Sequence, residues 1–405
     1  MKRLFWSAIG VLFLGLAVLP AQAAYTSLYI FGDGISTTTN NPSAGQYYYG
    51  LRRSNGRVWV EVLAQRLGLG ASSTTNVNWS NSSNNWSYYG QYSPNLVVNL
   101  NSFKKPSDAA TALFVVWVNN ADFVGDMGNI YPSLNLASWT NAINQSLSNH
   151  WQIITNLYYA KGARALVMPN AVDITEIPQY DSYPANTKIF IRNRVIDFNT
   201  AFTANIVNRA RTSLPGLTIY EPDFFALLDN ILTNAASYGL TNVLSGGVSI
   251  DAVENLLQNA AINGPGTNYI FWDTINPTAK LHEVMADVVQ QMISPVQIGQ
   301  ITALNGSNQL AVVNVPVGLN GFVDTATNMS PASWASLQNI TSTNTAQSVF
   351  VAQVTVSTNA SPALSGGGNQ VKPADSGGSG LLGGPTPTYL MHFYRLRFPY
   401  AWNWP

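Results

Sequence analysis

The sequence predicts an α/β protein with three layers, in which helices cover both faces of a parallel sheet. Short apolar runs, rich in β-branched and aromatic residues, alternate with longer segments whose apolar residues recur every three or four positions. The runs at 28–31 and 113–118 are continuously apolar, as is typical of strands that are buried on both faces. Strands that alternate with helices in this way favour a parallel sheet.

Four apolar runs are predicted to form this sheet, and four periodic segments are predicted to form helices. Gly32 ends the first strand and Pro169 the third, and Pro277 is expected in the first turn of the last helix. The predicted strands are residues 28–31, 113–118, 163–168 and 217–220, and the predicted helices are residues 58–67, 139–159, 198–213 and 277–293.

The pattern changes after residue 295, where helical periodicity gives way to short apolar segments separated by turn residues. Strands are expected within 296–317, 321–323 and 349–356. Residues 364–388 are rich in Gly, Ser and Pro and predict a long loop, and residues 389–405 predict an aromatic strand. We therefore expect a main domain over residues 25–295 and a small C-terminal β-rich domain over residues 296–405.

The first 24 residues have the pattern of a secretory signal peptide. Lys2 and Arg3 precede an apolar run, and small residues around Ala23 form an Ala-x-Ala cleavage site. A membrane anchor is the alternative, but the run of about 16 residues is shorter than the ~20 that a spanning helix needs. No later stretch is long enough to span a membrane. We expect a protein that is secreted, periplasmic or held at the cell surface.

Composition argues against several classes of partner and cofactor. Charged residues make up 9% of the chain, and 19 basic residues balance 19 acidic ones, so no basic surface for a nucleic acid is expected. The chain has no cysteine and therefore no disulfide. Neither a His/Cys cluster with metal-ligand spacing nor a Gly-rich phosphate loop is present. The sequence predicts no metal and no cofactor.

Five short motifs then occur in a fixed order along the main domain. They are Phe31-Gly32-Asp33-Gly34-Ile35-Ser36, Ser54-Asn55-Gly56-Arg57-Val58-Trp59-Val60-Glu61, Trp117-Val118-Asn119-Asn120-Ala121-Asp122-Phe123, Gly162-Ala163-Arg164 and Phe271-Trp272-Asp273-Thr274-Ile275-Asn276-Pro277-Thr278. Together they resemble the GDSL (SGNH) esterase-lipase family and extend over most of the main domain. The resemblance implies a parallel three-layer α/β/α fold and hydrolysis of ester bonds.

The resemblance also assigns catalytic positions, and most of them are replaced. The nucleophilic serine of the family corresponds to Gly34, which has no hydroxyl, and the basic histidine corresponds to Asn276, whose amide does not accept a proton. The oxyanion donors correspond to Asn119 and Ala121, and alanine has no side-chain donor. Only the orienting acid, Asp273, is retained, and we expect it to form a hydrogen bond with Asn276.

Other residues offer weak replacements for the lost groups. Ser36 lies two residues beyond Gly34 and is expected to start a helix. His150 and His282 fall in predicted helices and His392 in the C-terminal strand, all without catalytic context. A shifted alignment places Asn120 in the oxyanion position, although this restores neither nucleophile nor base.

Two functional hypotheses follow from these replacements. The first is an inactive pseudo-hydrolase that binds a glycan or an acyl-ester-like ligand in a cleft widened by Gly34 and lined by Asn119, Asn120 and Asn276. The alternative is an active hydrolase of ester bonds with a rearranged nucleophile. An aromatic tract is expected either to stack on a ligand or only to pack its own loop; its residues are Trp79, Trp86, Tyr88, Tyr89 and Tyr92.

Overall fold

The computed structural model describes residues 25–38, 47–70, 84–241, 244–245, 248–256, 260–304, 306–326, 333–352 and 392–399. The predicted signal peptide, Trp79 and the predicted loop at 364–388 lie outside these residues. Of the predicted aromatic strand, the structure describes residues 392–399. Within the described residues, every helix is too short or too polar to cross a lipid bilayer.

The sheet of the main domain has four strands in the order in which they occur along the chain. They are β1 (Leu28–Gly32), β2 (Leu113–Trp117), β3 (Ala165–Val167) and β4 (Thr218–Tyr220). All pairs are parallel, with Leu28 opposite Leu113 and Ala165 opposite Thr218. Every residue of β2 is buried, as expected of a strand covered on both faces. The predicted α/β fold with a parallel sheet is confirmed.

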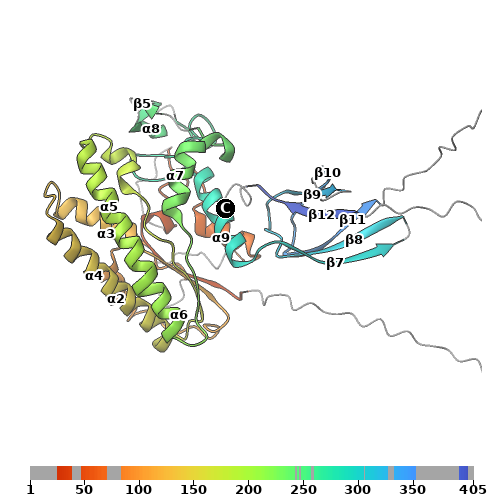
Figure 1. Cartoon of the computed structure of the whole chain (residues 1–405), viewed down its shortest axis with the longest axis horizontal. Helices are drawn as coiled ribbons and strands as arrows, with labels where there is room; N and C mark the ends of the chain where they lie inside the picture. Colours follow the sequence, from red (N-terminus) through yellow and green to blue (C-terminus); the bar gives the residue numbers. More distant parts are fainter. Residues whose placement is uncertain are drawn as a thin grey trace, which may run out of the picture.

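Helices cover the two faces of this sheet (Figure 1). On one face lie α1 (Trp59–Arg66), α7 (Phe224–Asn234) and α9 (Ala279–Ile293); on the other lie α2 (Ser93–Asn99), α3 (Asn119–Asn129), α4 (Leu136–Thr155) and α5 (Ala185–Phe202). The rings of Trp59, Trp117 and Phe224 join α1, β2 and α7 edge to face, with centroids 5.0–5.9 Å apart. Such contacts add to the stabilisation that comes from burying these large side chains.

Two predicted helix boundaries were wrong. The helix predicted at 198–213 begins earlier, because α5 starts at residue 185 and continues through η6 (Thr203–Asn208) into α6 (Arg209–Ser213). Pro277 is not in the first turn of α9, because Thr278 is the N-cap and its hydroxyl accepts a hydrogen bond from the Leu281 N–H at 3.3 Å. A threonine at this position satisfies a backbone donor that would otherwise lack a partner.

The remaining short elements of the main domain connect the larger ones. They are η1 (Gly34–Ser36), η3 (Asn156–Ala160), η4 (Ile174–Glu176), η5 (Pro178–Tyr180), η7 (Ala235–Tyr238), β5 (Leu244–Ser245), β6 (Val248–Ser249) and α8 (Ala252–Asn255).

The C-terminal region forms two antiparallel sheets of three strands. One has the order β11 (Ala346–Ala352), β8 (Ser307–Val313), β7 (Gln297–Leu304); the other has the order β10 (Ala335–Ile340), β9 (Gly321–Ala326), β12 (Phe393–Arg397). A small hydrophobic core includes Leu310, Val323, Val351 and Phe398 and is separate from the core of the main domain. The β-rich character expected after residue 295 is therefore present.

A buried arginine connects this region to the main domain. Arg66, at the end of α1, forms an ion pair with Asp287 of α9 at 2.6 Å, and both side chains are at most 5% exposed. Arg66 also donates from Nη1 to the Val317 carbonyl at 3.1 Å, and its backbone carbonyl accepts from the Val317 N–H at 3.2 Å. One side chain therefore ties two helices to the loop after β8.

Candidate functional site

The carboxyl ends of the parallel strands meet at one edge of the sheet, and a cleft lies there. Its walls come from the turn after β1, the segment before α2, the start of α3 after β2, the loop after β3 and the loop before α9. The lining residues are Asp33, Gly34, Ile35, Tyr89, Gly90, Tyr92, Asn120, Ala121, Val124, Val172, Ile174, Ile177, Ile275 and Asn276. The cleft encloses about 640 Å³, counting its open mouth. It therefore brings together three of the five expected positions: Gly34, Ala121 and Asn276.

The side chain of Tyr89 occupies the space next to Gly34. A Cβ atom built on Gly34 would lie 2.8 Å from Cδ2 of Tyr89, a distance that real Cβ atoms do not tolerate. The guanidinium of Arg53 lies over the Tyr89 ring, 3.8 Å from its centroid. The expectation that Gly34 widens the cleft was therefore wrong, because the Tyr89 ring fills the space that the missing side chain leaves.

The retained acid and the replaced base form the expected hydrogen bond. Asn276 donates from Nδ2 to both carboxylate oxygens of Asp273, at 2.9 and 3.0 Å. The backbone N–H groups of Ile275 and Asn276 donate to the same carboxylate, and the hydroxyl of Tyr48 donates to it at 2.9 Å. The Asp273 carboxylate thus holds the loop before α9 in a tight turn, with an amide where a base would be.

The two asparagines at the start of α3 differ in their contacts. Asn119 donates from Nδ2 to the Pro169 carbonyl at 2.9 Å and is not among the residues that line the cleft. Its expected place in the cleft wall was therefore wrong, because its amide holds the loop after β3. Asn120 accepts at Oδ1 from the Val172 N–H at 3.0 Å and lies on the cleft wall.

Asp33 is a buried carboxyl group in the cleft that the sequence argument did not single out. It is 5% exposed, and its carboxylate caps η1 by accepting from the Ile35 N–H at 3.0 Å. Burial raises the pKa of the Asp33 carboxyl to about 7, and the hydrogen bond from Ile35 opposes this only in part. Asp33 directly precedes Gly34 in the first motif, and this position could have identified it as a cleft residue from the sequence.

Ser36 lies outside the cleft and in the core. It is fully buried, and its hydroxyl accepts a hydrogen bond from Nε1 of Trp59 at 3.0 Å. Among the described residues that line the cleft there is no Ser, Thr, Cys, His or Lys. The described cleft wall therefore lacks a serine, threonine or cysteine nucleophile and a histidine or lysine base, and Asp33 is its one carboxyl group.

The three histidines lie outside the lining of the cleft: two are buried in helices and one precedes β12. His282 is buried in α9, and burial lowers its pKa to about 3. His150 is buried in α4 against Phe198 and Phe202, its Nδ1 lies 2.8 Å from the Ser146 carbonyl oxygen, and burial lowers its pKa. His392 immediately precedes β12 in the C-terminal region, with its Nδ1 3.4 Å from the Thr325 hydroxyl.

The aromatic tract divides between packing and the cleft. Trp86 is buried against Phe103, with ring centroids 5.5 Å apart, and the hydroxyl of Tyr88 accepts from Asn99 at 3.3 Å. Tyr89 and Tyr92 line the cleft, and Tyr89 is 44% exposed. Of the described rings of the tract, Tyr89 and Tyr92 therefore reach the cleft, and Arg53 lies over the ring of Tyr89.

A second, more apolar hollow adjoins the cleft. It shares Ile35, Asn120, Val172, Ile177 and Ile275 with the cleft and encloses about 480 Å³, counting its opening. The other lining residues are Trp117, Phe224, Leu227, Leu228, Ile231, Phe271, Pro277, Leu281 and Met285. Asn120 contributes the one polar side chain of this lining, so the hollow fits an apolar group.

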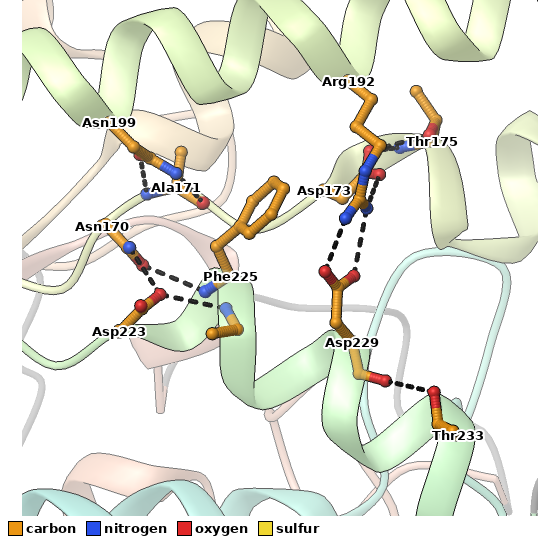
Figure 2. Close-up of polar contacts among 11 residues, drawn as sticks. Asn170, Ala171, Asp173, Thr175, Arg192, Asn199, Asp223, Phe225, Asp229 and Thr233 are labelled. Carbon is orange, nitrogen blue, oxygen red and sulfur yellow. Dashed lines mark hydrogen bonds and ion pairs between the residues drawn. The ribbon is translucent and has the colours of Figure 1, made fainter. Parts of the chain in front are cut away.

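The loop after β3, which supplies Val172, Ile174 and Ile177 to the cleft wall, is anchored from two helices (Figure 2). From α5, Asn199 donates to the Ala171 carbonyl and accepts from the Ala171 N–H, both at 2.9 Å. Arg192 of α5 bridges two carboxylates: that of Asp173, which is fully buried in the loop, and that of Asp229 in α7. The N···O distances are 2.5–3.0 Å. These contacts fix one wall of the cleft without entering it.

Asn170 anchors the start of the same loop to α7. Its Nδ2 donates to Asp223 at 2.7 Å, and its Oδ1 accepts from the Phe225 N–H at 3.0 Å (Figure 2). Asp223 in turn caps α7 by accepting from the Ala226 N–H at 2.9 Å.

Comparisons with known proteins agree with this architecture. The family model described as GDSL-like lipase/acylhydrolase matches residues 28–289, more than half of the chain. A GDSL esterase/lipase of Arabidopsis thaliana is 24% identical over 331 residues, which cover 69% of this chain and 86% of the relative. A second Arabidopsis GDSL esterase/lipase is 24% identical over 191 residues, or 44% of this chain and 52% of that relative. The chain belongs to the GDSL-like lipase/acylhydrolase family.

Proposed function

We propose that this family member binds a ligand in the cleft and does not hydrolyse it. The observation that carries the proposal is the pair of Gly34 and Tyr89. The nucleophile position has no hydroxyl, and the ring of Tyr89 occupies the space where a serine side chain would begin. Loss of the histidine at Asn276 and of the amide at Ala121 removes the base and one oxyanion donor, and one such donor alone is worth about 10²–10³ in rate.

The lining favours an acyl-ester-like ligand over a glycan. Apolar side chains dominate both hollows, and Asn120 is the polar side chain that the two linings share. Ligand sites of this kind bind an apolar group and orient it with a small number of polar contacts. A glycan needs many hydrogen-bonding partners, so the open cleft with Tyr89 and Tyr92 suits at most one sugar ring.

The test compares hydrolysis of short-chain p-nitrophenyl esters by the native chain and by restored variants. Gly34→Ser with Asn276→His returns the nucleophile and the base, and Tyr89→Ala makes room for the serine. Asn276→His with Tyr89→Ala, but without the serine, is the matched control. We expect no turnover by the native chain or the control, and slow turnover by the triple variant.

Two outcomes would oppose the proposal. Turnover by the native chain that is abolished by Ser36→Ala would show a rearranged nucleophile, as in the alternative hypothesis. Turnover by the native chain that survives Ser36→Ala would place the nucleophile elsewhere, and the Tyr89→Phe and Tyr92→Phe variants would then locate it.

We further propose that the protein is exported with removal of residues 1–24, and that residues 25–295 and 296–405 are its two domains. The basic and apolar pattern of the first 24 residues supports export, and the two separate hydrophobic cores support the division. N-terminal sequencing of the protein recovered from outside the cytoplasm tests the cleavage. A mature chain that begins at Met1 would contradict it.

A further inference from the structure

A third hollow lies between α2, α3 and α4 and differs in chemistry from the two described above. It encloses about 550 Å³, counting its open mouth. Seven of its eleven described lining residues are Ser, Asp, Asn or Gln, whereas apolar side chains dominate the cleft and the hollow beside it. Tyr92, directly before α2, is the one described residue that this polar hollow shares with the cleft. The polar hollow therefore suits a different ligand.

The floor of the polar hollow is held by hydrogen bonds between its own helices. Asp122 of α3 accepts from the Ser93 N–H of α2 at 2.7 Å and from the Ser146 hydroxyl of α4 at 2.5 Å. Asn149 donates from Nδ2 to the Ser93 hydroxyl and accepts from Gln145, both at 3.0 Å. Ser93, Ser146 and Asn149 are at most 7% exposed. The shape of the hollow is thus fixed before any ligand enters.

Other polar groups of the lining are left for a ligand. The half-buried carboxylate of Asp126 forms no hydrogen bond or ion pair with another described residue, and burial, followed by the charge of Asp122, raises its pKa to about 7. The Asn129 amide and the Tyr92 hydroxyl likewise have no hydrogen-bond partner within the described part of the chain, and Gln145 keeps its Oε1 free in the same sense. These groups include both acceptors and donors.

This mixture selects among ligand chemistries. A hydroxyl both donates and accepts, so a ligand with several hydroxyls can use the carboxylate of Asp126 and the amide of Asn129 at once. An ammonium group only donates. An anion would face Asp122 and Asp126 without a cation, because the described lining contains no Lys, Arg or His.

The ring of Tyr92 adds an apolar surface to the same wall. A Cβ atom on Gly125 would lie 3.0 Å from Cε1 of Tyr92, so the glycine allows this ring to lie close against α3. An aromatic ring beside planar carboxyl and amide groups matches a ligand that has both apolar C–H groups and hydroxyls. A sugar ring has this combination.

We propose that the polar hollow binds a neutral sugar, with its hydroxyls on Asp126, Asn129 and Gln145 and its ring against Tyr92. The site is independent of the ligand proposed for the cleft, because the two linings have only Tyr92 in common.

The test titrates the native protein with three neutral sugars: methyl β-glucoside, methyl β-galactoside and methyl α-mannoside. Saturation-transfer NMR detects binding in the millimolar range. Methoxycyclohexane, a ring of the same size without the free hydroxyls, and butylamine, a cation, are the comparison probes. We expect at least one glycoside to bind saturably and methoxycyclohexane not to bind. Binding of none of the three glycosides would overturn the proposal.

Two pairs of variants locate the sugar. Asp126→Asn should weaken its binding about 10-fold, the effect of one hydrogen bond to a charged group. Asp197→Asn, on the exposed surface of α5, is the matched control and should bind as the native protein does. Ala142→Phe fills the polar hollow from α4 and should abolish binding, whereas Val124→Phe fills the cleft from α3 and should preserve it.

Thermal unfolding shows whether each variant is folded. If Ala142→Phe does not fold, Gln145→Ala replaces it, because Gln145 is exposed at the rim and its loss should weaken binding about 3- to 10-fold. Binding that survives Ala142→Phe and is lost in Val124→Phe would place the sugar in the cleft and contradict the proposal. Butylamine that binds more tightly than every glycoside, and less tightly in Asp126→Asn, would show a cation site instead.

Discussion

A Cβ atom on Gly34 would lie 2.8 Å from Cδ2 of Tyr89, so the residue at the nucleophile position and the tyrosine beside it cannot both keep their places if Gly34 gains a side chain. The Tyr89 ring is itself held by the guanidinium of Arg53, 3.8 Å from its centroid. The loss of the serine is therefore coupled to the packing of a second residue. Restoring the serine alone does not restore the site.

The first prediction is that Gly34→Ser destabilises the protein by about 1–3 kcal/mol, because the new Cβ forces Tyr89 to move. The same substitution in a Tyr89→Ala background should have little effect, so the two changes should not be additive. Urea unfolding of the four proteins of this cycle measures the coupling. Gly128→Ser is the control, because a Cβ at Gly128 meets no atom within 4 Å. Additive changes would contradict the steric relation.

The second prediction concerns the anchoring of the cleft wall by Arg192. Arg192→Met leaves the buried carboxylate of Asp173 without its ion-pair partner, so we expect a loss of about 1–3 kcal/mol in the free energy of unfolding. Hydrogen exchange of residues 169–177 should become faster, because Asp173 belongs to that loop. Arg194→Met is the matched control on α5, since Arg194 pairs with the exposed Asp197 of its own helix. Equal exchange in both variants would show that Arg192 does not hold the loop.

The sheet was predictable from the sequence because its first three strands, β1 to β3, are almost entirely buried and read as apolar runs. The runs at 28–31, 113–118, 163–168 and 217–220 differ from the observed strands by at most two residues at either end. The start of α5 was not found, because its apolar residues are spread around the helix and the 3.6-residue pattern is weak. The strand β10 was missed as well; four of its six residues are exposed, so it lacks a continuous apolar run.

The candidate site was predictable only in part. The five motifs gave the positions Gly34, Ala121 and Asn276, and the structure brings these three into one cleft. The direction of a side chain depends on tertiary contacts, so neighbouring residues with the same amide were not distinguished: Asn119 bonds to Pro169, whereas Asn120 faces the cleft. The ring of Tyr89 over Gly34 joins segments 55 positions apart, and no local pattern indicates such a contact.

The third prediction concerns the buried ion pair between Arg66 of α1 and Asp287 of α9. Arg66→Met should destabilise the protein by about 3–5 kcal/mol, because it leaves the buried Asp287 carboxylate uncompensated. Replacing both partners, as Arg66→Met with Asp287→Leu, should be less harmful than the single change. Chemical unfolding measures both. Lys188→Met, which removes the longer and more exposed pair with Asp181, should change stability by less than about 1 kcal/mol. A double variant as unstable as the single one would contradict this account.

The fourth prediction is that Asp33 makes the free energy of unfolding depend on pH. Burial raises the pKa of its carboxyl to about 7 in the folded protein, whereas an unfolded chain has ~3.9. Between these values the folded state binds more protons than the unfolded state, so stability decreases as the pH rises from about 4 to about 7 and stays lower above that. A pKa difference of this size corresponds to roughly 4 kcal/mol as an upper limit.

Asp33→Asn tests this, because asparagine retains an acceptor for the Ile35 N–H but does not ionise. Urea unfolding of both proteins at pH 4.5, 6 and 8 gives the difference in stability between them. Burial also raises the pKa of Asp126, Asp251 and Asp287, and these contributions cancel in the difference. We expect the native protein to lose stability relative to Asp33→Asn as the pH rises. A difference that stays constant across the three pH values would show that the Asp33 carboxyl ionises in the folded protein as it does in the unfolded chain.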